Sequence, residues 1–341
     1  MRLLVCGGAG FIGSTFVARR LAGTGDTIVV LDKLTYAGSR ENLAGIESDA
    51  RLAPRLSFVH GDICDADAVA PLVAESDAVV NFAAETHVDR SIASADDFLR
   101  TGVLGLNVLL DAARANRRRL VQVSTDEVYG SIESGAASED WPLRPRSPYA
   151  AAKAAGDLLA IANHVTHGTD VVISRGANTY GPRQHPEKLV PLFVTNALDN
   201  EPLPMYGDGQ QRRDWLFVDD HADAIALILD RGVAGEIYNV PGTAEHVNRD
   251  VAERILAATG RPAALLRRVA DRPGHDRRYA MTGDRLAALG WQPRVGFEDG
   301  LKQTVAWYAA NRDWWQRARG PGWADYYEGL YGRRLAESTP A

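Results

Sequence analysis

A hydroxyl residue and two carboxylates end an apolar run and form the segment best suited to chemistry. The segment reads Val123-Ser124-Thr125-Asp126-Glu127-Val128-Tyr129-Gly130. Adjacent side chains on a strand point to opposite faces, so Asp126 and Glu127 can reach one small molecule only where the strand ends and the backbone turns. Parallel α/β sheets place their sites at such strand ends. We therefore predict that Thr125, Asp126 and Glu127 serve a common site.

A tyrosine and a lysine at helical spacing follow this segment. Tyr149 and Lys153 stand four residues apart and share one face of a helix that we expect to run from Pro148 to about Val165. A free tyrosine ionises near a pKa of about 10 and is a weak base at neutral pH, but a nearby ammonium favours the phenolate. The spacing alone is common in helices. Its meaning depends on what binds beside it.

A glycine-rich loop near the N-terminus supplies that context. Gly7-Gly8-Ala9-Gly10-Phe11-Ile12-Gly13 contains G-x-G-x-x-G between an apolar run and a helix expected from about Phe11 to Ala22. Glycines permit a tight turn against a pyrophosphate at a helix N-terminus. Asp32 follows nineteen residues after Gly13, where a carboxylate accepts a ribose 2′-hydroxyl and repels a 2′-phosphate. The motif predicts bound NAD, with Tyr149 accepting a hydroxyl proton as hydride leaves the same carbon.

The elements that position these residues follow an alternating pattern. Short apolar runs alternate with helical periodicity, at Leu3–Cys6, Ile28–Leu31, Leu56–Val59, Ala78–Phe82 and Leu120–Val123. This pattern predicts an α/β fold with a Rossmann-type doubly wound parallel sheet and a smaller, intertwined C-terminal substrate lobe. We expect an NAD-binding domain over residues 1–175, joined by part of 210–245, a mainly substrate-binding lobe over 176–335, and a frayed tail over 336–341.

Polar segments outside the catalytic stretch mark further candidates. In the run Phe82–Ser91, small residues and then charged ones follow the fourth apolar run, where a binding site is expected. A helix from about Ala95 to Ala115, with Ser94 as its N-cap, should follow. Asp62 ends the third run, where contact with adenine and helix capping are equally simple roles. Cationic candidates for an anionic substrate are Lys188, Arg213, Arg277 and Arg278, each of which could equally form a solvent-exposed salt bridge.

Composition narrows the classes of function. The chain has 341 residues, 45% hydrophobic and 24% charged, with a net charge of −6, which is typical of a globular protein and gives no support for nucleic-acid binding. Its two cysteines indicate neither a disulfide framework nor a metal site, and the first apolar run is too short for a signal peptide or membrane span. We expect a cytoplasmic protein. The Trp and Tyr residues near the C-terminus favour packing over stacking on a nucleotide base.

With these motifs in hand, the chain resembles the extended short-chain dehydrogenase/reductase family over about Met1 to Tyr308, and within it the nucleotide-sugar 4,6-dehydratases. The motifs that carry the resemblance, besides the glycine loop and Ser124–Gly130, are Leu31–Gly38, Glu85–Ser91, Pro186–Leu189, Arg213–Trp215 and Gly274–Asp276. Epimerases of the same family share the glycines and the Tyr/Lys pair but usually lack the acidic pair after Thr125. The acidic pair therefore favours the dehydratases.

The resemblance implies a lyase that oxidises C4 of a nucleotide sugar, eliminates water across C5 and C6, and returns hydride to C6. On this pattern Thr125 and Tyr149 hold the 4-hydroxyl, Lys153 orients Tyr149 and the nicotinamide ribose, Asp126 is the acid and Glu127 the base at C5. Tightly bound NAD would be recycled within each turnover. The expected substrate is dTDP-glucose, giving dTDP-4-keto-6-deoxyglucose, and the expected assembly is a homodimer that pairs the Tyr149 helix with its neighbour.

The expected contacts fall into two groups. We expect NAD to be held by residues of the strand ends and their loops, namely Gly7, Gly10, Phe11, Ile12, Gly13, Asp32, Lys33, Thr35, Gly38, Asp62, Ile63, Ala83, Ala84, Tyr149 and Lys153. We expect the nucleotide sugar to be held by Glu85, His87, Thr125, Asn178, Glu187, Lys188, Leu189, Tyr206, Arg213, Asn248 and His275. No metal is expected.

Some residues differ from those usual in the family and bear on the choice of nucleotide and sugar, namely Cys6, Thr15, Gly102, Leu106, the stretch Gly176–Thr179 and Arg183. The alternatives are a UDP- or GDP-sugar 4,6-dehydratase, a UDP-sugar 4-epimerase, and a nucleotide-binding regulator without catalysis on the same fold.

Overall fold

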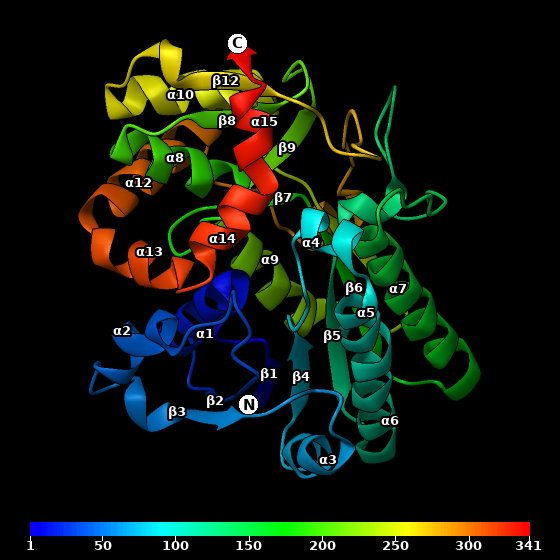
Figure 1. The fold of residues 1–341 in the computed structure, drawn as a ribbon. Coiled ribbons are helices and arrows are strands. Elements are labelled where there is room, and N and C mark those ends of the chain that lie inside the picture. The colour runs from blue at the N-terminus through cyan, green and yellow to red at the C-terminus, as the bar shows by residue number, and fades with distance from the viewer.

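A seven-stranded parallel sheet forms the centre of the computed structural model, which describes residues 1–341 (Figure 1). Its strand order is β10-β6-β5-β4-β1-β2-β3, with all pairs parallel. The strands are β1 (Arg2–Cys6), β2 (Thr27–Asp32), β3 (Leu56–His60), β4 (Ala78–Asn81), β5 (Arg119–Thr125), β6 (Val171–Gly176) and β10 (Ile237–Val240). The predicted Rossmann-type fold is confirmed. Strand order reverses between β1 and β4, which is where such sheets bind ligands.

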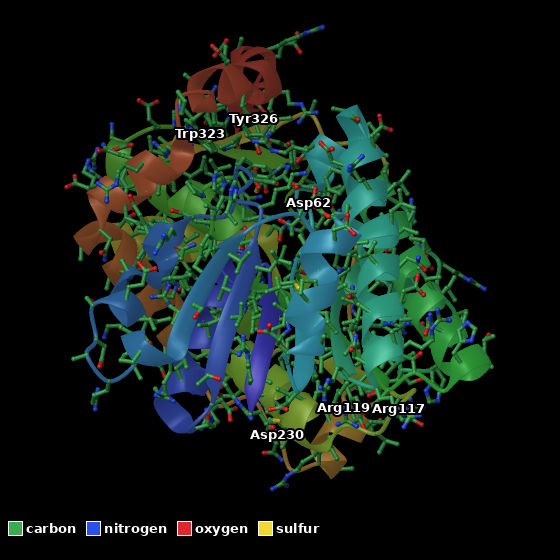
Figure 2. All side chains as sticks on the ribbon, turned by 90° about the horizontal axis from the view of Figure 1, so that it is seen from below. Asp62, Arg117, Arg119, Asp230, Trp323 and Tyr326 are labelled. Atoms are coloured by element: carbon green, nitrogen blue, oxygen red, sulfur yellow. The ribbon has the colours of Figure 1, made fainter.

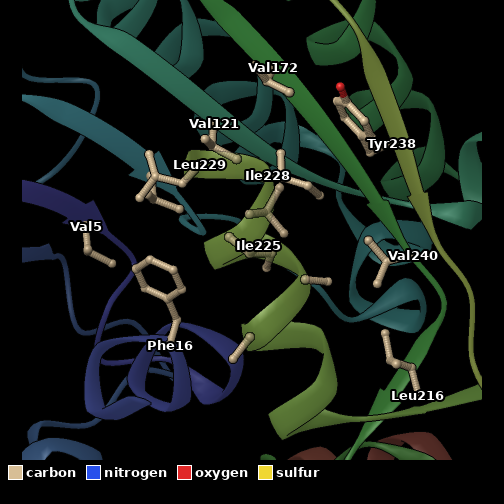
Figure 3. Close-up of a cluster of buried hydrophobic side chains, with 14 of the residues drawn as sticks. Val5, Phe16, Val121, Val172, Leu216, Ile225, Ile228, Leu229, Tyr238 and Val240 are labelled. Carbon is tan, nitrogen blue, oxygen red and sulfur yellow. The ribbon is translucent and has the colours of Figure 1, made fainter. Parts of the chain in front are cut away.

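Helices cover both faces of this sheet, which explains why its strands are apolar on both sides. On one face α1 (Phe11–Gly23) packs with α9 (Val218–Arg231), and Figure 3 shows Phe16 of α1 beside Val5 of the sheet, with Ile225 of α9 in the same cluster. On the other face α3 (Ala66–Ala74), α6 (Leu106–Asn116) and α7 (Pro148–His167) cover alternate strand residues such as Leu4.

The helix predicted over Ala95 to Ala115 is divided in the structure. α5 (Asp96–Leu99) continues into a π-helical segment, η3 (Arg100–Gly105), and then into α6. The prediction that Ser94 is the N-cap of this helix is wrong. Ser94 ends α4 (Val88–Ala93), and Ala95 precedes α5 without a side-chain cap. The prediction failed because the π segment keeps a helical sequence pattern.

The helix that carries Tyr149 and Lys153 agrees better with expectation. α7 begins after Ser147, whose hydroxyl accepts the backbone N–H of Ala150 at 3.1 Å, and it ends at Gly168, where φ is 68°. A left-handed C-cap of this kind favours glycine. The helix therefore extends two residues past the predicted end at Val165.

A smaller lobe is built from two three-stranded sheets, β11-β9-β7 and β13-β12-β8, around a second apolar core. Its strands are β7 (Asn178–Tyr180), β8 (Leu203–Tyr206), β9 (Arg212–Phe217), β11 (Glu245–Val247), β12 (Leu266–Val269) and β13 (Thr339–Pro340). Its helices are α8 (Leu189–Asp199), α10 (Asn248–Thr259), α12 (Phe297–Ala310) and α13 (Arg312–Arg319). Between β9 and β11 the chain returns to the large sheet as α9 and β10. The tail differs from the expected frayed end, because β13 pairs with Arg267 and Arg268 of β12.

Short elements complete the chain. They are α2 (Ala44–Glu47), α11 (Asp284–Ala288), α14 (Trp323–Tyr327) and α15 (Arg333–Ala336), with the single turns η1 (Arg40–Leu43), η2 (Ala53–Arg55), η4 (Asp126–Tyr129), η5 (Ala263–Leu265) and η6 (Glu328–Gly332). None of the helices is both long and apolar enough to span a membrane.

The C-terminal helices join the two lobes at the carboxyl ends of the large sheet. Figure 2 shows Trp323 and Tyr326 on the same side as Asp62, and Arg119 and Asp230 at the opposite edge. The Tyr326 ring lies over the Arg90 guanidinium at 4.1 Å from the ring centroid. Arg317 forms an ion pair of 2.8 Å with Glu41. The aromatic residues near the C-terminus therefore pack between lobes, as favoured from sequence.

Candidate active site

A deep cleft opens beyond the strand ends at the β1/β4 switch point, and its glycine turn leaves no room for side chains. A Cβ added to Gly13 would lie 2.3 Å from the carbonyl oxygen of Gly7, and one added to Gly7 would lie 2.6 Å from the backbone nitrogen of Ala83. Gly7 also has a φ of 73°, which glycine adopts without strain. This turn brings the N-terminus of α1 to the cleft with its free N–H groups, as pyrophosphate binding requires.

Asp32 ends β2 with its carboxylate fixed at the cleft. Its two oxygens accept the backbone N–H groups of Ala9 at 2.8 Å and Leu34 at 2.9 Å. Neighbouring Asp62 and Lys33 form an ion pair of 2.8 Å. A rigid carboxylate beside a glycine cradle fits a dinucleotide with a free ribose 2′-hydroxyl. All the residues expected to hold NAD line this one cleft.

The strand–turn junction after β5 presents the acidic pair to the same cleft. β5 ends at Thr125, and the single turn η4 begins at Asp126. The Thr125 hydroxyl caps the turn by accepting the backbone N–H of Glu127 at 3.3 Å, and it donates to Asp126 Oδ1 at 3.2 Å. Because the backbone turns here, both carboxylates reach the cleft, as predicted.

The two carboxyl groups have different surroundings. Burial and the neighbouring charge of Glu127 raise the pKa of Asp126 well above its ordinary value. Burial also raises the pKa of Glu127, but the cations Arg272, Arg213 and Lys188 oppose the increase. The Tyr279 hydroxyl lies 2.8 Å from Asp276 Oδ2 and 3.4 Å from Glu127 Oε2. Asp126 is therefore the better proton donor and Glu127 the better acceptor.

α7 places Tyr149 and Lys153 against the end of β5. The Lys153 ammonium donates to the carbonyl oxygen of Val123 at 2.6 Å, and burial lowers the pKa of Lys153 to about 8. Burial and the charge of Glu127 raise the pKa of the Tyr149 phenol. The backbone N–H of Tyr149 donates to the Ser91 hydroxyl at 3.1 Å, which fixes the start of α7 to α4. Without a further cation nearby, Tyr149 is accordingly a neutral phenol.

A second pocket, between the two lobes, adjoins the cleft and shares Thr86, Glu127, Asn178 and Lys188 with it. Of the residues expected to contact substrate, Glu85 and Thr125 line the cleft, Asn178 and Lys188 line both cavities, and the second pocket holds His87, Glu187, Leu189, Tyr206, Arg213, Asn248 and His275. The structure thus brings every predicted site residue to one continuous site, with Glu127 at the junction.

The cations of the second pocket are only partly those suggested by sequence. Arg213 is buried and its guanidinium lies 4.2 Å from the centroid of the Tyr279 ring. Arg277 and Arg278, by contrast, pair with Asp208 and Glu245 and do not line the pocket, which favours the alternative that they form salt bridges.

Sequence reasoning missed Arg272 and Tyr279, which line the second pocket. The only signal for them is their closeness to the Gly274–Asp276 motif. It also missed His221, whose imidazole reaches the cleft from α9 and receives or donates a hydrogen bond of 2.7 Å with Thr179. A Cβ on Gly176 would lie 2.4 Å from that imidazole. The unusual glycine at 176 is thus explained by the space that His221 occupies.

Comparison with known proteins gives the same family throughout the chain. Residues 4–304 match the family model described as GDP-mannose 4,6 dehydratase. The dTDP-glucose 4,6-dehydratase of Streptomyces niveus is 54% identical over 340 residues, covering 98% of this chain and 100% of that protein.

Two solved structures extend the comparison. DesIV, the dTDP-glucose 4,6-dehydratase of Streptomyces venezuelae solved with NAD and TYD bound, has a TM-score of 0.90 and 54% identity, covering 93% of this chain and 100% of that one. The dTDP-glucose 4,6-dehydratase of Bacillus anthracis in complex with NAD has a TM-score of 0.86 and 42% identity, with 93% and 99% coverage. The chain, with its acidic pair beside the Tyr/Lys pair, belongs to the dTDP-glucose 4,6-dehydratases, the NAD-dependent nucleotide-sugar lyases of the extended short-chain dehydrogenase/reductase family.

Proposed function

We propose that the chain converts dTDP-glucose to dTDP-4-keto-6-deoxyglucose and water. The observation that carries the proposal is the different surroundings of two adjacent carboxyl groups, Asp126 and Glu127, beside Tyr149 and Lys153 in one cleft. Relatives that share half the sequence are named for this reaction. An oxidation alone would use Tyr149 and Lys153 and would leave the carboxyl pair without a task.

The chain's own residues supply the proton transfers. The chemistry that NAD supplies when bound is to accept a hydride from C4 and to return it to C6. Tyr149, made a phenolate by the ammonium of Lys153 and the positive cofactor, takes the C4 hydroxyl proton. The resulting ketone acidifies C5, from which Glu127 takes a proton, while Asp126 gives one to the departing C6 hydroxyl. Glu127 finally returns a proton to C5, so water leaves and no net oxidation occurs.

We propose that the second pocket binds the nucleoside diphosphate. Arg213, Arg272 and Lys188 provide cationic groups in a lining that also contains carboxyl groups and apolar side chains, and charge-assisted bonds from such cations to phosphate are strong. Glu127 lies at the junction with the cofactor cleft. A nucleotide anchored in the second pocket would therefore place its sugar beside Asp126 and Tyr149.

The proposal is tested with a panel of dTDP-glucose, UDP-glucose, UDP-galactose and GDP-mannose. We expect dTDP-glucose to be turned over fastest, with a product that shows the base-induced absorbance of a 4-keto sugar and is identified by mass and NMR. A 4-epimer without a keto product would instead indicate an epimerase, and preference for a UDP- or GDP-sugar would contradict the proposed substrate.

We also propose that the protein is a cytoplasmic homodimer. Both cysteines are free, which suits a reducing compartment. Large apolar side chains are exposed along α5, η3 and α7, with Leu99 47%, Leu104 62% and Leu158 57% exposed. These elements pack side by side at one edge of the molecule (Figure 1), where Gly156 approaches the backbone of Gly102. An apolar face of this kind suits a second copy of the chain.

A further inference from the structure

The proposed reaction leaves two residues in the wrong protonation state after each turnover. Tyr149 has gained the C4 hydroxyl proton and Asp126 has lost a proton to the leaving water, whereas Glu127 is restored when C5 is reprotonated. Tyr149 and Asp126 are only 8% and 4% exposed, so exchange with bulk water is hindered. A second turnover requires one proton to move from Tyr149 to Asp126. This requirement rests on the proposed function.

The Thr125 side chain lines the same cleft as these two residues. Thr125 Oγ1 donates to Asp126 Oδ1 at 3.2 Å in a buried hydrogen bond. Thr125 is also near enough to the Tyr149 phenol to lower its pKa, against burial and the charge of Glu127, which raise it. The backbone N–H of Glu127 fixes the hydroxyl from a third side at 3.3 Å. Thr125 is therefore held where it can receive a proton from Tyr149 and pass its own to Asp126.

The two oxygens of Asp126 have separate surroundings. Oδ1 faces Thr125, while Oδ2 is buried without any hydrogen-bond partner and belongs to a side chain that lines the cleft. An unpartnered buried oxygen is costly unless a ligand satisfies it. Oδ2 is thus the oxygen available to the C6 hydroxyl of a substrate, and Oδ1 is the oxygen available to receive a proton when Asp126 is reprotonated.

Other neighbours of Asp126 are poor sources of this proton. Burial raises the pKa of Asp214 to about 6, so Asp214 is mostly a carboxylate at neutral pH, and it accepts the backbone N–H of Gly242 at 2.7 Å. Arg213 is a guanidinium, which does not release its proton in proteins. Glu127 takes and returns the C5 proton in the proposed reaction, so it has no net proton to give.

We propose that Thr125 is a proton relay that returns the proton from Tyr149 to Asp126 at the end of each turnover. The O–H bond of Tyr149 breaks as one forms on Thr125, and the original O–H bond of Thr125 breaks as one forms on Asp126 Oδ1. Tyr149 becomes a phenolate again and Asp126 a carboxylic acid. The χ2 torsion of aspartate is broad and roughly two-fold, so rotation of the carboxyl group then carries the proton to the substrate side.

The test compares two rates within each variant. Thr125→Val removes the hydroxyl at similar volume, and Thr125→Ser retains it as the matched control. One rate is product formation in a single turnover with enzyme in excess, and the other is the steady-state rate with saturating dTDP-glucose. A first turnover starts with Asp126 already protonated, so it does not need the relay. Bound NAD and thermal unfolding confirm that each variant is folded.

We expect the steady-state rate of Thr125→Val to fall at least about tenfold below its own single-turnover rate, within the range of one assisted proton transfer, and to recover as imidazole buffer is increased. In Thr125→Ser the two rates should stay equal. Equal rates in Thr125→Val, without a buffer effect, would show that Thr125 only positions the substrate and would overturn the relay. If the unsubstituted protein forms no 4-keto product, the proposed function fails instead.

Discussion

Asp126 and Glu127 are adjacent in sequence, and the turn after β5 gives them different neighbours. Asp126 is closed in by burial and by the charges of Glu127 and Asp214, whereas Glu127 faces Arg272 and other cations. Their spacing in the sequence predicted a shared site, but not which carboxyl group is the better proton donor. That difference comes from cations that lie more than sixty residues away in the sequence, and no local pattern could supply it.

Asp126→Asn should separate oxidation from elimination. The amide keeps the size of the side chain but cannot give a proton to the C6 hydroxyl, while Tyr149 and Lys153 remain unchanged. We expect the absorbance of reduced nicotinamide to accumulate on mixing with dTDP-glucose, and product formation to fall by about 10²–10⁴-fold. Stopped-flow absorbance and product assay measure the two effects. Full activity in this variant would remove Asp126 from its role.

Lys153 should set an alkaline limit on activity. Burial lowers the pKa of this ammonium to about 8, so the charge is present below that pH and is lost as pH rises through it. Tyr149 then loses the cation that favours its phenolate. We expect kcat/KM to fall as pH rises above about 8. In Lys153→Arg the guanidinium stays charged, so this fall should move to higher pH. The same alkaline limit in both proteins would assign it to another group.

At the scale of elements, α7 carries the site on successive turns. Tyr149, Lys153 and Asp157 follow one another at intervals of four residues, and Asp157 is paired at 2.8 Å with Arg175 of β6, both being almost fully buried. Arg175 also donates to the Tyr129 hydroxyl at 2.9 Å. This network ties the helix of Tyr149 and Lys153 to β6, the strand beside β5, and to the turn that carries Asp126.

Breaking this pair on one side should destabilise the protein. Asp157→Asn leaves the Arg175 guanidinium buried without a counter-charge, for which we expect a loss of about 3–5 kcal/mol in the free energy of unfolding. The double variant Asp157→Leu with Arg175→Met removes both charges and should recover most of the loss. Urea unfolding measures both values. A single variant as stable as the unsubstituted protein would show that the pair does not anchor α7.

Local sequence patterns predicted where helices and strands lie, but not where a helix departs from regular α-helical geometry. The strands and α7 were predictable because apolar runs and helical periodicity report burial directly. The π-helical segment η3 was not predictable, because Gly102 and Gly105 pack closely against residues that are distant in the sequence. A Cβ on Gly105 would lie 2.7 Å from the Ile63 side chain, and one on Gly156 would lie 2.7 Å from the Gly102 carbonyl oxygen. Close packing of this kind depends on tertiary neighbours.

At the scale of the whole molecule, two lobes enclose a continuous site that neither forms alone. The large sheet supplies the cofactor cleft, and the smaller lobe contributes Arg213, Arg272 and Tyr331 to the second pocket. The chain crosses between lobes several times, and its last helices close the gap. The sequence predicted the two lobes and their intertwining. It did not predict that Thr339–Pro340 would pair with β12, because two exposed residues carry no hydrophobic pattern.

The proposed dimer is testable through its apolar face. Leu104→Glu combined with Leu158→Glu places two charges on η3 and α7, where a partner would otherwise bury leucines. We expect the unsubstituted protein to sediment as a dimer and the double variant as a folded monomer. Ala258→Glu, at an exposed residue of α10 in the smaller lobe, is the matched control and should remain dimeric. A dimeric double variant would place the interface elsewhere.

The central claim is that the acidic pair at the end of β5 eliminates water across C5 and C6. The most direct measurement is the NMR spectrum of the product formed from dTDP-glucose in deuterium oxide. Glu127 is partly exposed at the junction of the two cavities, so the proton it takes from C5 exchanges with solvent before one is returned. We predict a 4-keto-6-deoxy product with deuterium at C5. A product that carries only hydrogen at C5 would contradict the assigned role of Glu127 and with it the mechanism.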